Sequence, residues 1–250
     1  MRQDGGEQIA LLLHQGAQRA AKRGQAAPCR FITGAQRQTA LEEAHANGVT
    51  AVFNGGWADA ERVQVCFVPM GEEPVFTAVW LEITWAAKFA HLAHSDLLGS
   101  LMSLGMDRSL FGDLIVSDDH AVLLSMPEVG EMLITDWHEA GHTPIHVRML
   151  EQPPVITPPQ GTPMRDTIAS LRLDCVLSSG MSVSRTKAAD IIRQGLVQLN
   201  HVPEERTDLL LKEGDLLSVR GFGRIRLTEI GGKTRKDRIA VQLEVFKRDK

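Results

Sequence analysis

The chain has 250 residues, of which 43% are apolar and 23% are charged, and its formal net charge at pH 7 is −4. This length predicts about two domains, or three smaller ones. The apolar run IALLL near the start is much shorter than the ~20 residues that span a bilayer, and it lacks the basic flank and cleavage site of a signal peptide. We therefore expect a cytoplasmic protein without a membrane segment.

Three cysteines, Cys29, Cys66 and Cys175, stand far apart in the sequence and form no CxxC pair. This spacing argues against a disulfide framework and against a thiolate zinc site. We expect all three to be buried thiols.

Charge is distributed unevenly along the chain. Residues 165–250 hold 17 of the 27 Lys and Arg but only 12 of the 31 Asp and Glu, whereas residues 1–164 carry a net excess of acidic side chains. Such asymmetry indicates a basic C-terminal module that meets a polyanion. The alternative, that these charges only keep the surface solvated, stays open until a motif is found.

The first part of the chain predicts a small α/β domain. Apolar spacing favours helices over 6–24 and 36–46, a strand over 49–53 and an alternating strand over 62–69. We place this N-terminal domain at residues 1–72.

The next part, residues 73–150, predicts the order strand, helix, strand, strand, helix, strand. The predicted strands cover 75–83, 111–116, 120–125 and 145–150, and the predicted helices cover 94–105 and 127–140. This order is typical of the split βαβ, ferredoxin-like plait, to which RRM domains belong. Its strand pair lacks the exposed aromatic side chains with which RRMs stack bases, so we expect a scaffold or protein-contact module.

Residues 151–163 contain five prolines in thirteen positions, which deny backbone donors to any regular element. We interpret this segment as an interdomain linker, followed by a C-terminal domain over 164–250.

Two short helices open the C-terminal domain. Ser170 can cap a helix over 171–179, with Gly180 in the left-handed position that follows it, and Ser184 can cap a second helix that ends before Gly195. The second helix has an apolar arc and an opposite polar arc, the latter made of Thr186, Lys187, Asp190, Arg193 and Gln194. We therefore expect one face of this helix to lie in a core and the other to be exposed to solvent or a ligand. The direction of the Arg185 side chain stays open at this point.

Strands follow the helices. They are predicted over 196–200, 214–220 and 223–227, and the alternation of the third sends Arg224 and Arg226 to one side. Beyond them, Gly231 and Gly232 are expected to form a turn beside a group of cations, Lys233, Arg235, Lys236 and Arg238.

The stretches LRLDCVLSSG, SRTKAADIIRQGLVQLN and EGDLLSVR together resemble the S4 RNA-binding domain. The resemblance implies a positively charged surface, formed by the paired helices and the adjoining strand, that fits structured RNA. It implies contacts from Arg172, Ser184, Arg185, Lys187, Arg193 and Asn200. The chain departs from the S4 pattern after Asn200, where S4 domains have glycine and this sequence has His201.

A wider set of stretches is similar to the YlmH family of S4 proteins: RGFGRIRLTEIGGKTRKDRIAVQL, RFITG, FNGGWADAER and SDLLGSLMSLGMDRSLFGDLIV. This resemblance implies a three-part bacterial protein that binds the ribosome and its tRNA, with links to quality control of stalled large subunits and to cell division. The expected fold is thus α+β, with an N-terminal α/β domain, a central ferredoxin-like (RRM-like) plait and a C-terminal S4 (αL-type) domain.

Base stacking has few platforms in the basic module, since Phe222 and Phe246 are its only aromatic residues. Phosphate contacts are therefore expected to carry the affinity. We expect a monomeric, non-catalytic protein that needs no cofactor or metal and binds structured rRNA or tRNA on the large ribosomal subunit. The candidate RNA-binding residues are Arg172, Ser184, Arg185, Thr186, Lys187, Arg193, Gln194, Asn200, Arg220, Arg224, Arg226, Lys233, Arg235 and Lys236.

Alternative functions rest on weaker signals. His138, Glu139 and His142 match the HExxH pattern of zinc hydrolases, but Gly141 and Pro144 argue against the continuous helix that this site needs. S4 modules are also appended to RNA-modifying enzymes, yet the chain has no GxGxxG for a methyl donor. The glycine-rich FNGGWADAER segment is better explained as a turn held by Asp59 and Arg62 than as an active site.

Overall fold

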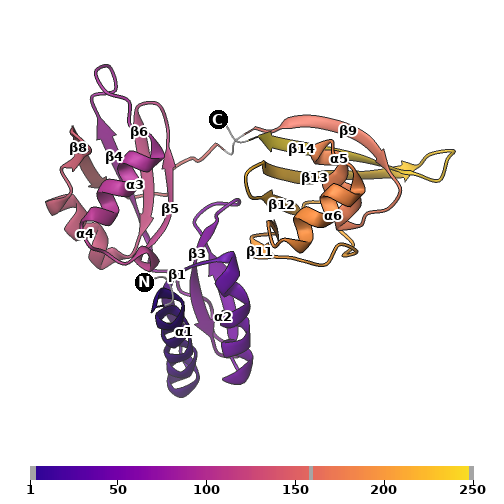
Figure 1. The fold of residues 1–250 in the computed structure, drawn as a ribbon. Coiled ribbons are helices and arrows are strands. Elements are labelled where there is room, and N and C mark those ends of the chain that lie inside the picture. Colours follow the sequence, from indigo (N-terminus) through magenta and orange to yellow (C-terminus); the bar gives the residue numbers. More distant parts are fainter. Residues whose placement is uncertain (1–3, 158–159, 248–250) are drawn as a thin grey trace. The chain divides into compact units, whose positions relative to one another are not determined.

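The chain divides into two units, Met1–Ile156 and Thr157–Lys250, in a computed structural model that describes residues 4–157 and 160–247. Each unit has its own sheets and its own core (Figure 1). The mixture of helices and antiparallel sheets confirms the predicted α+β class. A finer division of the first unit at residue 72 stays a prediction. Within the described residues, no helix is both long and apolar enough to cross a membrane.

The first unit begins with two helices, α1 (Asp4–Arg23) and α2 (Gly34–Ala46), that pack on a small sheet. Three antiparallel strands form this sheet in the order β1-β3-β2, namely β1 (Ala27–Thr33), β3 (Arg62–Val68) and β2 (Thr50–Asn54). Both predicted helices and both predicted strands are therefore present, and β1 is an addition.

Strand β1 is absent from the predicted elements because it contains Pro28, which has no N–H to donate to a sheet. The strand lies at the edge of its sheet, where this missing donor is tolerated. Its register with β3 also shifts between Pro28 and Phe31, and this irregularity interrupts the period-two pattern on which strand prediction depends.

The rest of the first unit is the predicted plait. Its elements are β4 (Val79–Trp85), α3 (His94–Ser103), the short 3-10 helix η1 (Arg108–Leu110), β5 (Phe111–Val116), β6 (His120–Ser125), α4 (Pro127–Asp136), β7 (Glu139–Ala140) and β8 (Thr143–Met149). The strands pair in the antiparallel order β5-β6-β4-β8-β7, and the first four have the ferredoxin-like arrangement. Helices α3 and α4 cover one face of this sheet through buried apolar side chains.

The opposite face of the central sheet, which reads bases in RRM domains, is partly covered by the N-terminal elements. Trp80, Val122 and Leu124 of this face form a buried cluster with Phe31 of β1, and the half-buried Trp57 packs against it. Base reading across the middle of this sheet is therefore blocked by the protein itself.

The FNGGWADAER segment forms a turn that is fixed to the central sheet. One carboxylate, Asp113, accepts hydrogen bonds from the Trp57 indole and from the Arg62 amide, both at 3.0 Å. The Arg62 Nε donates to the Phe111 carbonyl at 2.8 Å. Burial, with the nearby Arg108 cation, lowers the pKa of Arg62 to about 10. Asp113 therefore holds the turn together with Arg62, while the predicted role of Asp59 stays a prediction.

The HExxH match lies on a hairpin. Helix α4 ends at Asp136, four residues before the predicted end at 140, because the chain turns there and buries the Trp137 side chain. His138 precedes β7, and His142 follows Gly141, whose φ of +62° forms the tight turn into β8. Among the described residues, no three His, Cys, Asp or Glu side chains are grouped to hold a metal ion.

The second unit is one six-stranded antiparallel sheet with two helices on one face (Figure 1). The strand order is β11-β10-β12-β13-β14-β9. Its elements are β9 (Thr162–Ile168), α5 (Leu173–Met181), α6 (Arg185–Arg193), β10 (Val197–Leu199), β11 (Val202–Pro203), β12 (Leu216–Val219), β13 (Gly223–Lys233) and β14 (Ile239–Lys247). All three cysteines of the chain are free and buried, as predicted.

Strand β9 corrects the expected extent of the proline-rich linker. The strand begins at Thr162 and includes Pro163, both of which fall in the segment 151–163 that was expected to be irregular. As in β1, the proline is accommodated because β9 is an edge strand. The expected linker residues 158–159 lie outside the described residues.

The first helix of the second unit is shifted by two residues from the predicted 171–179. Arg172 occupies the N-cap position, and the Ser170 hydroxyl accepts from the Arg172 amide at 3.1 Å without capping the helix. The left-handed residue after the helix is Ser182, with φ of 55°. The expected C′ residue, Gly180, lies inside the helix, where its lack of a side chain allows α5 to approach the sheet closely.

The third predicted strand, 223–227, extends six residues further. Gly231 and Gly232 belong to this longer strand, β13, and do not form the expected turn. The turn comes after them, where Asp237 has φ of 56°. Register shifts between β13 and β14 accompany the extension and interrupt the alternation that would have identified both strands.

Substitution Gly180→Val should lower the free energy of unfolding of the second unit by about 2–3 kcal/mol, because a Cβ at residue 180 would stand 2.7 Å from the buried Ile225 Cδ1. Gly232→Val is the control, since a Cβ there meets nothing within 4 Å. All four tryptophans lie in the first unit, so a loss that is seen by circular dichroism but not by tryptophan fluorescence reports the second unit. Equal stability of the two variants would contradict the close approach.

Candidate nucleic-acid interface

One carboxylate joins the first turns of the two helices in the second unit. Asp174, in the first turn of α5, accepts from Arg172 Nε at 3.2 Å and from Arg172 Nη2 at 3.3 Å. The same carboxylate accepts from Arg185 Nη2 at 2.8 Å. Because Arg172 is the N-cap of α5 and Arg185 is the first residue of α6, one acidic side chain holds a guanidinium at the start of each helix.

The carboxylate is buried and the guanidinium groups are not. The Asp174 side chain is 7% exposed, whereas those of Arg172 and Arg185 are 36% and 55% exposed. Each guanidinium has five N–H donors, but Arg172 uses only two of them on Asp174 and Arg185 only one. The other donors can bind a phosphate oxygen. Asp174 therefore fixes the two guanidinium groups on their buried side, and their exposed side can bind a ligand.

The protonation states of this group follow from its contacts. Burial alone would raise the pKa of the Asp174 carboxyl, but the hydrogen bonds from Arg172 and Arg185 outweigh burial and hold the pKa below its usual value. In turn, the hydrogen bonds to Asp174 raise the pKa of both arginines. At neutral pH the three groups are all charged and their sum is positive.

The first turn of α6 adds to this positive region. The Ser184 hydroxyl accepts from the Lys187 amide at 3.2 Å, which confirms Ser184 as the N-cap. Thr186 and Lys187 are exposed, while Ala188 and the other apolar residues of the helix are buried, as the sequence predicted. We name Arg172, Arg185 and Lys187 the helix-start cluster.

Other candidate residues lie at the far end of α6. Arg193 is eight residues beyond Arg185, or about 12 Å along the helix axis. Its guanidinium lies 3.1 Å from the Asp190 carboxylate, in an exposed pair, and the neighbouring Gln194 is also exposed. The polar face of α6 thus extends away from the helix-start cluster.

Asn200 has a structural role in this unit. Asn200 and His201 have φ of 49° and 69°, which is the type I′ geometry of a two-residue hairpin, here between β10 and β11. The Asn200 side chain donates to Asp215 Oδ1 at 2.8 Å and accepts from the Leu216 amide at 3.0 Å. His201 therefore occupies the position of the S4 glycine without loss of the turn, and a direct RNA contact from Asn200 stays a prediction.

Arg224 and Arg226 lie on the face of the sheet that points away from the helices. Their neighbour Ile225 is fully buried in the core beneath α5 and α6, and alternation sends the two arginines to the other side. The Arg226 guanidinium lies 5.9 Å from the centroid of the Phe246 ring. The predicted common side of Arg224 and Arg226 is correct, but this side differs from that of the helix-start cluster.

The remaining candidates lie in turns and at a strand end. Arg220 is exposed after β12, and Lys233, Arg235 and Lys236 are exposed at the tip of the β13–β14 hairpin, which projects past the rest of the sheet in Figure 1. Lys233 is paired with Asp237 at 2.8 Å. The candidate set is therefore spread over the helix starts, the outer sheet face and the hairpin tip.

Two residues near the helix-start cluster were absent from the candidate set. The first is Asp174, whose position two residues after Arg172 in the first turn of a helix is the only sequence signal for its role. The second is Arg238, whose Nε donates to the Thr167 carbonyl of β9 at 3.0 Å. Arg238 and Arg185 together line a small pocket of about 110 Å³ against β9 and α5. The position of Arg238 next to β9 depends on the β9–β14 pairing, which the sequence patterns did not predict.

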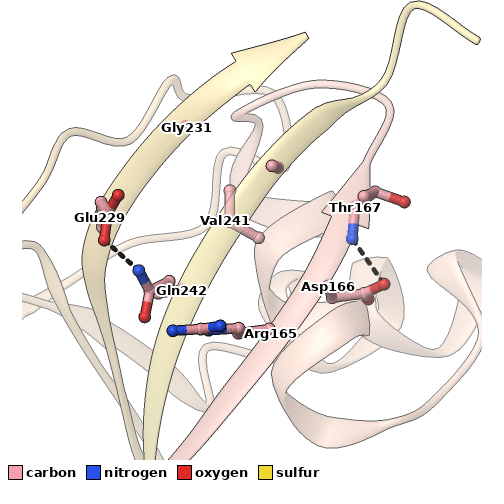
Figure 2. Close-up of a pocket in the computed structure, with 8 residues that line it drawn as sticks. Arg165, Asp166, Thr167, Glu229, Gly231, Val241 and Gln242 are labelled. Carbon is pink, nitrogen blue, oxygen red and sulfur yellow. Dashed lines mark hydrogen bonds between the residues drawn. The ribbon is translucent and has the colours of Figure 1, made fainter. Parts of the chain in front are cut away.

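A wider hollow, of about 540 Å³, lies over β9, β13 and β14 (Figure 2). Of the described residues that line it, Arg165 is basic, and Glu229 and Asp166 are acidic. Glu229 accepts a hydrogen bond from Gln242, which Figure 2 marks with a dashed line. No residue of the helix-start cluster lines this hollow, and its mixed charges do not favour a phosphate.

Two family models and one curated relative match this chain. Residues 71–153 match the family model "Putative RNA-binding domain in YlmH", and residues 171–217 match the model of the S4 domain. The chain is 34% identical over 200 residues to "Ribosome-associated protein quality control protein P2" of Bacillus subtilis (strain 168), with 78% of each chain covered. The chain belongs to the YlmH family of S4-domain RNA-binding proteins.

The family indicated by the sequence motifs is thereby confirmed. Among solved structures, the YlmH-family chain is similar to "Cell division protein ylmH from Streptococcus pneumoniae", with a TM-score of 0.47 and 22% identity. That similarity covers 55% of this chain and 86% of the other.

Substitution Asp174→Asn should lower the free energy of unfolding of the second unit by about 1–2 kcal/mol at pH 7, after allowance for the half-exposed arginines. Because the pKa of Asp174 is lowered in the folded state, its contribution exists above the ordinary pKa of about 4 and is lost as the pH falls through the lowered value. The difference between variant and parent should therefore shrink below about pH 4.

The measurement is urea unfolding followed by circular dichroism over a series of pH values. Asp190→Asn is the matched control, because its pair with Arg193 is exposed on both sides and should contribute at most about 0.5 kcal/mol. A difference for Asp174→Asn that is the same at every pH would show that the carboxylate charge does not hold the two arginines.

Proposed function

We propose that this YlmH-family protein binds structured RNA on the large ribosomal subunit and takes part in ribosome-associated quality control without catalysing a reaction. The observation that carries this proposal is the helix-start cluster, in which two half-exposed guanidinium groups from separate helices are fixed by one buried carboxylate. The name of the Bacillus subtilis relative supports the ribosomal setting. The setting implies a cytoplasmic protein, and we propose that it acts as a monomer.

Phosphate is the RNA group that this cluster suits best. A guanidinium presents parallel N–H donors that match two phosphate oxygens, and a buried carboxylate fixes the plane of each group before RNA arrives. Helices α5 and α6 also begin at the cluster, so their positive dipole ends add to the field at the same place. The positive potential at this surface therefore comes from the guanidinium groups, from the start of α5 and from the start of α6.

The same surface has little means to read bases. The two aromatic residues of the second unit, Phe222 and Phe246, are both half-buried, and Phe246 lies on the sheet face that points away from the helices. Recognition by positioned phosphates depends on the shape of a folded RNA, and we therefore propose an rRNA or tRNA element of defined tertiary structure as the ligand.

The other candidates extend the proposed contact in two directions. Along α6, Thr186, Arg193 and Gln194 continue the exposed polar face. At the hairpin tip, Lys233, Arg235 and Lys236 form a second cationic site that could contact another RNA segment. We assign Arg224 and Arg226 to this second cationic site, because they do not share a face with the helix-start cluster. We also assign Arg220, which is exposed after β12, to this site. The link to cell division stays a prediction.

The double substitution Arg185→Gln/Lys187→Gln should weaken binding to purified large ribosomal subunits on the order of 100-fold, since each charge-assisted contact is worth about 1.5 kcal/mol. Lys22→Gln/Arg23→Gln, in the last turn of α1, removes the same charge and should leave binding unchanged. Co-sedimentation measures the affinity, and circular dichroism checks the fold. Lys187→Gln alone changes only an exposed side chain, so its effect cannot come from misfolding. Parental affinity of the double variant would refute the proposed site.

Salt dependence gives an independent test of phosphate binding. With about five phosphates neutralised, log K should fall with log salt at a slope of about −4. Lys187→Gln should make the slope shallower by roughly 0.7–0.9, which is the share of one phosphate. The slope is obtained by titrating protein against large subunits at several salt concentrations. A slope near zero, or one that Lys187→Gln leaves unchanged, would be at odds with a phosphate contact at this residue.

A further inference from the structure

Phe89 is the one exposed aromatic side chain among the described Phe and Trp residues. It is 90% exposed, whereas all the others in the described part of the chain are buried or half-buried. It stands in the loop that joins β4 to α3 in the central plait. A single exposed apolar side chain is common on folded domains, so the case for a ligand depends on the setting of this ring.

The loop that carries Phe89 is held in a defined shape. The Phe89 and Ala90 amides donate to the Ala86 carbonyl at 2.9 and 3.2 Å, and the Ala87 amide donates to the Trp85 carbonyl at 2.9 Å. On the other side, Leu92 is 4% exposed and belongs to the core under α3. The loop backbone is therefore ordered before a partner binds, and at Phe89 mainly the side-chain rotamer remains to be fixed on binding.

The charges of this loop favour an anionic ligand. Residues 83–95 contain Lys88, His91 and His94, all exposed, and no Asp or Glu. At the same end of the sheet, Thr84 is in register with His120 and with His146. The nearby Asp119 carboxylate lies 2.7 Å from His120 Nδ1. The loop thus carries one lysine directly beside Phe89 and an exposed histidine, His91, two residues further along. The lysine ammonium can donate to a phosphate oxygen.

Because the middle of the central sheet is covered, an RNA contact by this domain would have to use another surface, such as this loop. The central domain matches a family model that is described as RNA-binding, yet Phe31 and Trp57 of the N-terminal elements pack on the middle of its sheet. An RNA contact by this domain therefore requires another surface. We propose that Phe89 stacks on an unpaired RNA base while Lys88 binds an adjacent phosphate. This inference rests on the proposed function and adds a second RNA contact, in the first unit.

Magnitudes favour a base over a protein as the ligand. A stable protein interface buries about 1,200–2,000 Å² with an apolar centre, but the neighbours of Phe89 in its loop are alanines, a lysine and a histidine. One ring suffices for a base, because each stacked base gives about 1–3 kcal/mol. A single exposed ring beside one lysine is enough to bind a base and a phosphate, but it is too small for a stable protein interface.

The test compares substitutions of Phe89 in the full chain, with purified large ribosomal subunits as the probe. Phe89→Ala and Phe89→Leu should each weaken binding by about 5- to 150-fold, the equivalent of one lost stacking contact. Phe89→Trp should bind within about threefold of the parent, because an indole stacks at least as well. The control is Met70→Ala, which removes a side chain that is 98% exposed in the same unit and should have no effect.

Chemical probing of the bound RNA identifies the contact. With the parent protein, one unpaired base should be shielded from a base-modifying reagent, and Phe89→Ala should restore its reactivity. Unchanged affinity for Phe89→Ala, or the absence of a base whose shielding depends on Phe89, would overturn the inference. Parental affinity for Phe89→Leu with a loss for Phe89→Ala would also overturn it, because that pattern identifies an apolar protein pocket.

The two proposals fail separately. If Arg185→Gln/Lys187→Gln abolishes binding while Phe89→Ala does not weaken it, the helix-start contact stands and the stacking contact is wrong. If neither set of substitutions affects binding, both proposed contact sites are wrong. If the parent protein itself does not bind large ribosomal subunits, the proposed function is wrong. Thermal unfolding of each Phe89 variant should match that of the parent, since the side chain lies outside the core.

Discussion

The pairing of one buried carboxylate with two arginines is the interaction on which the proposed surface of the second unit depends. Asp174 would be unfavourable in its buried position without Arg172 and Arg185, and their guanidinium groups would be mobile without Asp174. This mutual dependence also fixes α5 against α6, because the two arginines begin the two helices. Stability and ligand binding thus draw on the same three side chains, so changes at Asp174 affect both.

The two proposed RNA contacts, one in each unit, differ in kind. The second unit has a rigid cationic surface with half-buried aromatics, which suits phosphates of a folded RNA. The first unit uses its central sheet to bind its own N-terminal elements through Phe31 and Trp80. Among its described Phe and Trp residues, Phe89 alone is exposed, on a loop. A protein with both contacts would recognise an RNA surface where a structured phosphate backbone and an unpaired base occur at suitable positions.

Sequence patterns predicted the elements whose hydrophobic period is regular. Helix α6 was predicted with its cap at Ser184 and its buried arc, and the plait was predicted in its full order. Two of the missed strands, β1 and β9, lie at sheet edges and contain Pro28 and Pro163, so the local signal opposed a pairing that only tertiary structure allows. The role of Gly180 was misjudged because its contact with Ile225 joins distant parts of the chain. Of the candidate site, the residues at the helix starts were found, while the acceptor that joins them was not.

The most direct measurement is arginine footprinting of the unmodified protein with a dicarbonyl reagent, read by mass spectrometry with and without large ribosomal subunits. The account predicts that Arg172 and Arg185 lose reactivity together when the particle is bound, while Arg148, which pairs with Glu82 in the first unit, keeps its reactivity. Continued reactivity of Arg172 and Arg185 in the bound state, with protection only of Arg224 and Arg226, would show that the RNA binds the opposite face of the sheet. That result would contradict the central claim.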